Sequence, residues 1–403
     1  IQIELNVFFR ENHEIIKDLK NSYELEQKSG EIKKSAACTN EFFYLSGWVP
    51  INFINSFNKL LMCFDNRILL ITKQPNERIN KDIMPPTMLI NNKFFKPFES
   101  MVLMYGVPSY GEIDPTTFLA ITYTLMFGAM FGDVGQGLVL LLAGFLLKNK
   151  EGRINLGGVF ETLGVSSIVF GFLYGSVFGS EQVINALLIR PMENINDILI
   201  AAIVFGGGFL ILGFILGITN SIRKKDIERG IFGKDGIVGF MFYIGAITLI
   251  LSIVYKKTLF PKTIWMIYFI FLLLLILLKQ PLANIFLGKN ILFEEGAKDY
   301  FIESGFEVVE TLLSMFSNTL SFIRVGAFAL NHVGLFVAFA SMASMSKNGI
   351  TSVLILILGN IIIICLEGMI VFIQGLRLEY YELFSKYYEG SGVAFEPVKV
   401  KFN

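Results

Sequence analysis

The 403-residue chain contains little charge, because only 17% of its residues are Asp, Glu, Lys or Arg, against about 25% in an ordinary soluble domain. Acidic and basic residues are equal in number, 34 of each, so no excess of positive charge favours a nucleic-acid partner. Hydrophobic residues make up 53% of the chain, and several runs exceed the roughly 18 apolar residues that cross a bilayer core. The composition predicts a mainly α-helical, polytopic membrane protein.

Cysteine is also scarce. Cys38, Cys63 and Cys365 are scattered and form no CxxC pair, which argues against a disulfide framework or a zinc site. The glycine-rich runs GVPSYG and FGGGF are not followed by GK[ST], so neither is a phosphate-binding loop. We therefore expect no metal, cofactor or catalytic residue on this chain. The first residue is isoleucine and no cleavable signal is visible, so we expect the natural chain to have further residues before it.

The N-terminal part of the chain is more polar than the rest. Residues 1–35 carry hydrophobic residues at roughly helical spacing and predict a soluble helix, such as the arm of a coiled-coil hairpin. Strand-like runs at 41–50 and 67–73 flank a predicted short helix at 51–62, which indicates a small cytosolic α+β lobe. Residues 84–116 are rich in proline and turn residues, as is typical of a linker.

We divide the chain into a cytosolic segment, residues 1–115, and a membrane domain, residues 116–403. Eight apolar stretches in the second part predict about eight transmembrane helices. They lie near 117–131, 134–147, 157–180, 197–221, 236–255, 263–279, 306–345 and 350–388. The distribution of Lys and Arg between alternate loops places both termini in the cytosol, with one outer loop disagreeing. The first two stretches predict a short hairpin or one long kinked helix. The polar segment 281–305 is expected to lie on the inner membrane surface.

The seventh stretch carries polar residues where a membrane helix is normally apolar. Its 40 residues would form a helix about 60 Å long, about twice the hydrocarbon thickness, so the helix is expected to tilt steeply. Glu310, Ser317, Arg324 and Asn331 are seven residues apart and therefore lie near one helix face, with Ser321 close by. An arginine at the centre of a membrane helix costs about 2.5–3.5 kcal/mol on insertion scales. An arginine at this position is therefore usually kept for a functional role.

The eighth stretch, also predicted to be long and tilted, has the same character. Asn360, Glu367 and Gln374 repeat the seven-residue spacing, and Arg377 follows three residues later. A polar seam that holds two helices together explains the Ser and Asn positions as well as a functional role does. The arginines and glutamates instead favour an ion or proton pathway. Asp133, in GDVGQG, suits a turn and an ion-access role equally.

The expected depth of these residues follows from the topology. On the seventh helix, which runs outward, Glu310 lies on the cytosolic side of Arg324 and His332 on the outer side. On the eighth helix, which runs inward, Glu367 lies outside Arg377. We therefore expect two polar vestibules, one open to each side of the membrane, with the two arginines between them.

Four runs carry a family resemblance: MYGVPSYGEIDPTTFLAITYTLMFGAMFGDVGQG, GFLYGSVFGSE, SNTLSFIRVGAFALNH and QGLRLEYYELFSKYYEGSGVAFEP. They resemble the membrane subunit called a, or I, of rotary V-type and A/V-type ATPases, in its prokaryotic form. The resemblance covers residues 40–403. The cytosolic lobe of that family is much larger than residues 1–100, so we expect this chain to hold its membrane-proximal part.

The resemblance implies a non-catalytic stator in a prokaryotic plasma membrane. Its expected partners are membrane lipids, a rotor ring of proteolipid c/K subunits, peripheral-stalk subunits E and G, and central-stalk subunit d/C. The critical arginine of the family falls on Arg324 and the second arginine on Arg377. The half-channel positions fall on Glu310, His332, Glu367 and Gln374.

Gln374 departs from the histidine that eukaryotic members commonly have, which makes Na⁺ conceivable beside H⁺ as the transported ion. Two alternatives stay open. One is a stand-alone secondary transporter or channel with an arginine gate, and the other is a membrane-anchored scaffold that conducts nothing.

Overall fold

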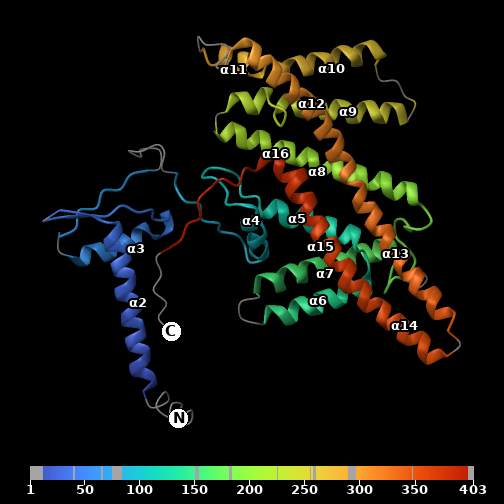
Figure 1. Ribbon diagram of the computed structural model, residues 1–403, viewed down its shortest axis with the longest axis horizontal. Helices are drawn as coiled ribbons and strands as arrows, with labels where there is room; N and C mark the ends of the chain where they lie inside the picture. The colour runs from blue at the N-terminus through green and yellow to red at the C-terminus, as the bar shows by residue number, and fades with distance from the viewer. Residues whose placement is uncertain are drawn as a thin grey trace. The chain divides into compact units, whose positions relative to one another are not determined.

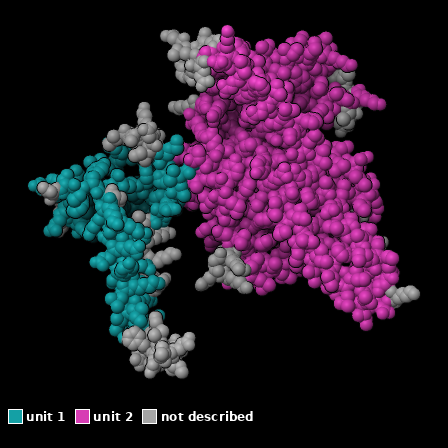
Figure 2. Space-filling view, viewed as in Figure 1, with its two compact units in different colours: residues 1–88, 392–403 teal, residues 89–391 magenta. Residues whose placement is uncertain are grey.

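The computed structural model describes residues 12–39, 41–64, 67–74, 84–149, 154–180, 184–224, 226–254, 256, 260–288, 296–346 and 348–397. The chain forms two compact units, residues 1–88 with 392–403 and residues 89–391 (Figure 2). The sequence-based boundary at residues 115–116 concerns where the membrane domain begins and stays a prediction. The first eleven residues of the predicted N-terminal helix lie outside the described residues.

The first unit is less regular than the sequence predicts. Helix α2 (His13–Ser35) is followed by the antiparallel strand pair β1 (Ala37–Cys38) and β2 (Phe43–Tyr44), then by α3 (Ile51–Leu61) and the 3₁₀ turn η1 (Met62–Phe64). Only two residues of the strand expected at 41–50 form a strand, and residues 67–73 form none, so these predictions were wrong. A strand needs a hydrogen-bonded neighbour. The described residues supply none for 67–73, and Leu69 is 87% exposed.

The segment 84–116 is more than a linker. It contains the 3₁₀ turn η3 (Lys96–Phe98) and helix α4 (Glu99–Tyr105). Phe98 and Val102 are fully buried in the core of the second unit. Their hydrophobic side chains pack this part of the segment against the membrane helices.

The second unit is a helical assembly. Its α-helices are α5 (Thr116–Met130), α6 (Val134–Lys148), α7 (Ile154–Tyr174), α8 (Ile195–Lys224), α9 (Ile237–Val254), α10 (Lys262–Leu277), α11 (Lys279–Phe286), α12 (Ala297–Ser321), α13 (Ile323–Ser344), α14 (Gly349–Ile362), α15 (Gly368–Arg377) and α16 (Ser385–Tyr387). Three π-helical turns interrupt them, η4 (Glu228–Phe232), η5 (Ile363–Glu367) and η6 (Leu378–Phe384). A helix therefore occurs at each of the eight predicted stretches.

Among the described residues, five helical segments are long and apolar enough to cross a membrane. They are Asn155–Tyr174, Ile195–Lys224, Glu228–Ile253, Lys298–Ser344 and Gly349–Tyr387. A sixth is possible if α10 and α11, which are bent by 70°, form one broken span. Helices α5 and α6 have only 15 residues each. Eight crossings thus stay a prediction, while a mainly helical protein with five or six candidate spans is observed.

The last two long segments cross the other helices diagonally (Figure 1). The first has 47 residues, about 70 Å of helix, and is interrupted at Phe322 between α12 and α13. Helix α12 begins at Ala297 and not at 306, so the end of the predicted surface segment 281–305 belongs to α12. The earlier part of that segment holds α11, and residues 289–295 lie outside the described residues.

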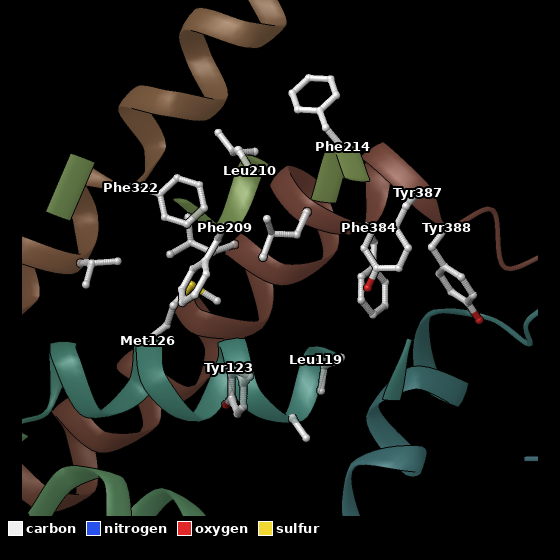
Figure 3. Close-up of a cluster of buried hydrophobic side chains, with 14 of the residues drawn as sticks. Leu119, Tyr123, Met126, Phe209, Leu210, Phe214, Phe322, Phe384, Tyr387 and Tyr388 are labelled. Atoms are coloured by element: carbon white, nitrogen blue, oxygen red, sulfur yellow. The ribbon is translucent and has the colours of Figure 1, made fainter. Parts of the chain in front are cut away.

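Aromatic side chains from distant parts of the sequence form the core of this unit (Figure 3). Tyr123 of α5, Phe214 of α8 and Phe384 of η6 are each at most 1% exposed. Phe322, at the α12–α13 break, is fully buried against Gly206 of α8. A Cβ atom at Gly206 would lie 2.0 Å from Cγ of Phe322. The missing side chain therefore makes room for the ring, two residues before Arg324.

Candidate functional site

The two predicted arginines lie in one electrostatic cluster although they are on different helices. Arg324, in the first turn of α13, is within electrostatic range of Arg377, the last residue of α15. Both guanidinium groups also interact with the carboxyl of Glu382, as does the hydroxyl of Ser321. Nη1 of Arg324 is buried and has no hydrogen-bond partner among the described residues.

Glu382 is a site residue that sequence reasoning missed. It follows Arg377 by five residues, which in an α-helix places two side chains on different faces. The intervening backbone is the π-helical turn η6, whose i→i+5 geometry has more residues per turn. This turn brings residues five apart onto the same side of the helix. The short distance in sequence between Arg377 and Glu382, in RLEYYE, was the available signal. It was not used because an α-helix would place these two residues on different faces.

A second cluster joins α13 to η5. Nδ1 of His332 lies 2.8 Å from Oε2 of Glu367, and Nε2 of His332 lies 3.8 Å from Oδ2 of Asp133. All three side chains are at most 2% exposed. The predicted residues His332 and Glu367 are therefore brought together, and Asp133 joins them. We call these three residues the outer cluster, because the predicted topology places them outside the arginines.

The Asp133 carboxylate is surrounded by donors. It accepts hydrogen bonds from the backbone N–H groups of Gln136 (2.8 Å), Phe178 (2.9 Å) and Gly179 (2.6 Å) and from the Ser176 hydroxyl (2.7 Å). The first of these bonds caps the N-terminus of α6, as Asp commonly does. Asp133 is therefore a turn residue and a neighbour of His332 at once.

The remaining predicted site residues are more dispersed. Glu310 lies on α12 and pairs with Lys234, their Oε1 and Nζ atoms 3.0 Å apart. Ser317 and Asn331 are exposed on α12 and α13. Gln374 is half-buried, and its Oε1 has no hydrogen-bond partner among the described residues. About 33 Å of helix separates Glu310 from His332, so the structure does not bring these two together.

Two residues after Arg377 in the sequence is another buried carboxyl that the sequence analysis did not single out. Glu379 of η6 is fully buried and accepts a hydrogen bond from the hydroxyl of Thr122 on α5. Its second oxygen, Oε2, has no hydrogen-bond partner among the described residues. Burying an ionised carboxylate with so few donors is very unfavourable.

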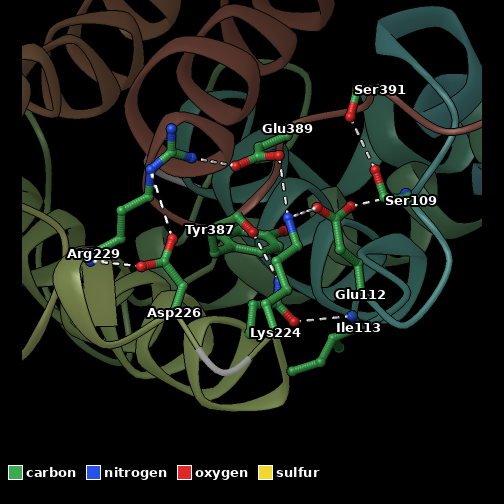
Figure 4. A network of polar contacts seen from close by, with 10 residues as sticks. Ser109, Glu112, Ile113, Lys224, Asp226, Arg229, Tyr387, Glu389 and Ser391 are labelled. Carbon is green, nitrogen blue, oxygen red and sulfur yellow. Dashed lines mark hydrogen bonds and ion pairs between the residues drawn. The ribbon is translucent and has the colours of Figure 1, made fainter. Parts of the chain in front are cut away.

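A network of ion pairs surrounds the C-terminal end of α8 (Figure 4). Lys224, at the end of α8, pairs with Glu112 (2.8 Å) and with Glu389 (3.1 Å). Glu389 also pairs with Arg229 (2.8 Å). The Glu112 side chain is only 1% exposed and accepts a further bond from the backbone N–H of Ser109. The network thus ties the segment before α5 and the segment after α16 to the same end of α8.

Neutral hydrogen bonds support this network. Asn220 of α8 accepts from the backbone N–H of Ile113 (3.0 Å) and donates to the carbonyl of Tyr387 (2.8 Å). The hydroxyl of Tyr388 donates to the carbonyl of Gly106 (2.8 Å). Burial raises the pKa of Tyr388, with a smaller contribution from the charge of Glu112, so the hydroxyl remains a donor. These contacts hold the C-terminal end of the last long helix in place.

Taken together, the arrangement can handle charge at three depths. Glu310 and Lys234 lie toward one end of the long helices, the arginine cluster lies in the middle, and the outer cluster lies toward the other end. A histidine between two carboxylates can bind and release a proton. Among the described residues, no group of three or more His, Cys, Asp and Glu side chains has a geometry that could hold a metal ion.

The chain is similar to known proteins over most of its length. Residues 32–181 and 289–400 match the V-type ATPase 116kDa subunit family. The chain is 30% identical to the A-type ATP synthase subunit I of Saccharolobus solfataricus, over 91% of this chain and 61% of that protein. It is 25% identical to the A-type ATP synthase subunit I of Methanocaldococcus jannaschii, over 95% of this chain and 59% of that protein.

A bacterial relative is similar over a shorter region. The chain is 29% identical to the V-type ATP synthase subunit I 2 of Treponema pallidum, over 50% of this chain and 51% of that protein. The chain thus spans between about half and three-fifths of the length of the curated relatives it matches. Because the family match covers more than half of its residues, this chain belongs to the V-type ATPase 116kDa subunit family.

Proposed function

We propose that this chain is the membrane stator of a rotary V/A-type ATPase, in which ions reach and leave a rotor ring through two half-channels. The observation that carries the proposal is Arg324. Its guanidinium is within electrostatic range of Arg377, and its buried Nη1 has no hydrogen-bond partner among the described residues. An unsatisfied buried donor of this kind is costly. A carboxylate on a neighbouring rotor subunit would satisfy it.

The mechanism follows from the cost of charge in lipid. A rotor carboxylate that faces lipid must be neutral, through protonation or Na⁺ binding. When it reaches Arg324 and Arg377, the two cations favour its ionised form and the bound ion leaves. Arginine suits this role because it stays charged at any physiological pH. The same cations prevent ions from passing directly between the half-channels, so transport requires rotation.

The two half-channels are assigned to the two ends of the long helices. The outer one contains the outer cluster, in which His332 exchanges protons with Glu367 and Asp133. The inner one contains Glu310, and we infer that the half-buried residues Gln374 and Ser321 and the exposed residues Ser317 and Asn331 line the surface facing the ring. The ion is H⁺ or Na⁺, since Gln374 itself does not titrate.

The assembly that this function requires is larger than the chain. We propose that all eight helical stretches cross the membrane, with α5 and α6 as the shortest crossings, and that both termini are cytosolic in a prokaryotic plasma membrane. The partners are the proteolipid c/K ring, peripheral-stalk subunits E and G, the central-stalk d/C subunit and membrane lipids. The chain is not catalytic by itself, and ATP hydrolysis takes place on other subunits.

Replacing Arg324 by alanine in the assembled complex tests the proposal. ATP-driven ion uptake into vesicles should fall to background, because the ring carboxylate then lacks the cation that favours its ionised form. Arg324→Lys should retain a charge but lose the planar donor set, so uptake should be much reduced. Arg190→Ala is the matched control, since Arg190 lies in a loop and pairs with the nearby Glu193. Normal coupled uptake by Arg324→Ala would refute the assignment.

The purified chain in vesicles separates this proposal from a stand-alone transporter. A stator without its ring should show no ion flux under a voltage or a concentration gradient. A secondary transporter or channel gated by an arginine would show flux that requires no other subunit. Saturable flux by the chain alone would therefore favour the alternative. A non-conducting scaffold would instead tolerate neutral substitutions at both Arg324 and Arg377.

A further inference from the structure

Two ion pairs connect a four-residue turn to α12 and α16. The turn supplies the lysine of one pair and the aspartate of the other. The turn, Gly233–Gly236, lies between η4 and α9 and is closed by a bond from the N–H of Gly236 to the carbonyl of Gly233. Nζ of Lys234 contacts Oε1 of Glu310 on α12 at 3.0 Å. Oδ1 of Asp235 contacts Nζ of Lys386 on α16 at 2.8 Å. Adjacent residues of opposite charge thus contact different helices.

The pair between Asp235 and Lys386 is the more buried of the two and holds the turn in place. The Lys386 side chain is 5% exposed and that of Asp235 is 27% exposed. The Lys386 ammonium also lies 5.3 Å from the ring centroid of Phe214, a cation–π contact. A buried ammonium is costly unless it is paired, so Asp235 is held firmly on α16. Because Lys234 is the neighbouring residue, its position relative to α16 is set as well.

The pair between Lys234 and Glu310 is the more exposed of the two. Side-chain exposure is 35% for Lys234 and 66% for Glu310. Neither group is enclosed by the described residues of the chain, so the pair can separate and re-form at little cost. One helical turn earlier, Glu307 pairs with Lys279 of α11 at 2.6 Å. The inner half of α12 is therefore held by lysines from two different segments, and only the Glu310 pair is largely exposed.

We propose that Lys234 is a positioning residue for Glu310: it is the mobile counter-ion of the inner half-channel carboxylate, and the turn 233–236 sets its place. This inference rests on the proposed function for the role of Glu310. The charged groups around the pair are Lys386, which acts on Glu310, and Asp235 and Glu307, which act on Lys234. The ammonium keeps the carboxylate ionised until an ion arrives from the inner side and then moves away into water.

Carbodiimide labelling of Glu310, measured by mass spectrometry in the assembled complex in vesicles, tests the proposal without any transport. Carbodiimides react with the protonated acid. At one fixed pH, Lys234→Met should therefore raise the labelling rate of Glu310 by roughly two- to fivefold, the range expected for an exposed ion pair. Lys234→Arg should restore the normal rate. Lys148→Met is the matched control, because it breaks a Lys–Glu pair of similar exposure with Glu161 on α6 and α7.

Two further arms separate positioning from general damage. Exchanging the charges of the more buried pair, with Asp235→Lys and Lys386→Asp together, should keep normal Glu310 labelling if the salt bridge re-forms, whereas Asp235→Ala alone should raise it. An unchanged labelling rate in Lys234→Met, or an equal rise in Lys148→Met, would overturn the proposal. Labelling is measured without ATP or rotation. Failure of the stator assignment would thus appear in the Arg324→Ala uptake assay and leave the labelling result standing.

Discussion

Three consecutive glycines in α8 allow a sharp test of how Arg324 is positioned. At Gly206 an added Cβ atom would lie 2.0 Å from Cγ of Phe322, whereas at Gly208 it would meet nothing within 4 Å. A normal carbon–carbon contact is about 3.5–4 Å, so the Phe322 ring would have to move by about 1.5 Å or more. Phe322 is fully buried and forms the break from which α13 starts. A displaced ring would therefore shift Arg324.

The magnitude comes from two opposing terms. Glycine-to-alanine changes inside a helix gain about 1 kcal/mol from helix propensity, and this gain applies to both Gly206→Ala and Gly208→Ala. Overpacking a filled core costs about 1–3 kcal/mol and applies only to Gly206→Ala. Gly206→Ala should therefore be less stable than Gly208→Ala by about 1–3 kcal/mol. The difference between the two variants isolates the clash.

Thermal unfolding in detergent and ATP-driven uptake by the assembled complex provide the two readouts. Gly206→Ala should unfold at a lower temperature than Gly208→Ala and should transport ions more slowly. Adding Phe322→Leu to Gly206→Ala should recover part of the stability, because the smaller side chain relieves the clash. Equal stability and equal uptake in the two alanine variants would refute the idea that the close packing of Phe322 against Gly206 positions Arg324.

The remaining predictions concern the ionic network and the outer cluster. Lys224→Ala should lower stability by about 1–2 kcal/mol, because it leaves the buried Glu112 carboxylate without its cation while Lys224 itself is partly solvated. Adding Glu112→Gln should recover stability, and no recovery would contradict the ion-pair explanation. Asp133→Asn should cost about 3 kcal/mol or more, since an amide replaces a charged acceptor of four hydrogen bonds and presents a donor to N–H groups. Asp197→Asn, at an exposed first-turn position of α8, is its control; both are measured by thermal unfolding, and an equal effect would argue against a structural role for Asp133.

Sequence reasoning identified the residues whose chemistry is unusual for their surroundings. Arg324, His332 and Glu367 stand out in an apolar run whatever the fold, because charge in lipid is costly. Hydrophobic length likewise indicated where the helices lie. Both inferences depend only on the composition of a local stretch. The sequence therefore suffices for the helix positions of the second unit, whereas the roles of the site residues stay a prediction.

Local patterns were insufficient where partners come from far along the chain. The strand predicted at 67–73 fails because the described residues give it no neighbour, and no local run of residues contains that information. Asp133 could not be distinguished from an ordinary turn residue until the fold placed it beside His332. Lys234 gave no signal either, since its pairing with Glu310 joins segments that are remote in sequence.

What the sequence determined by itself is the apolar character of the long helices, the location of those helices and the two arginines within them. Only the tertiary structure decided which of these charges meet. The π-helical turn η6 brings Glu382 within electrostatic range of the two arginines. An α-helix, with 3.6 residues per turn, would place Glu382 and Arg377 on different faces. The physical reason is that composition acts locally, whereas electrostatic partnership depends on distances that the packing of all helices sets together.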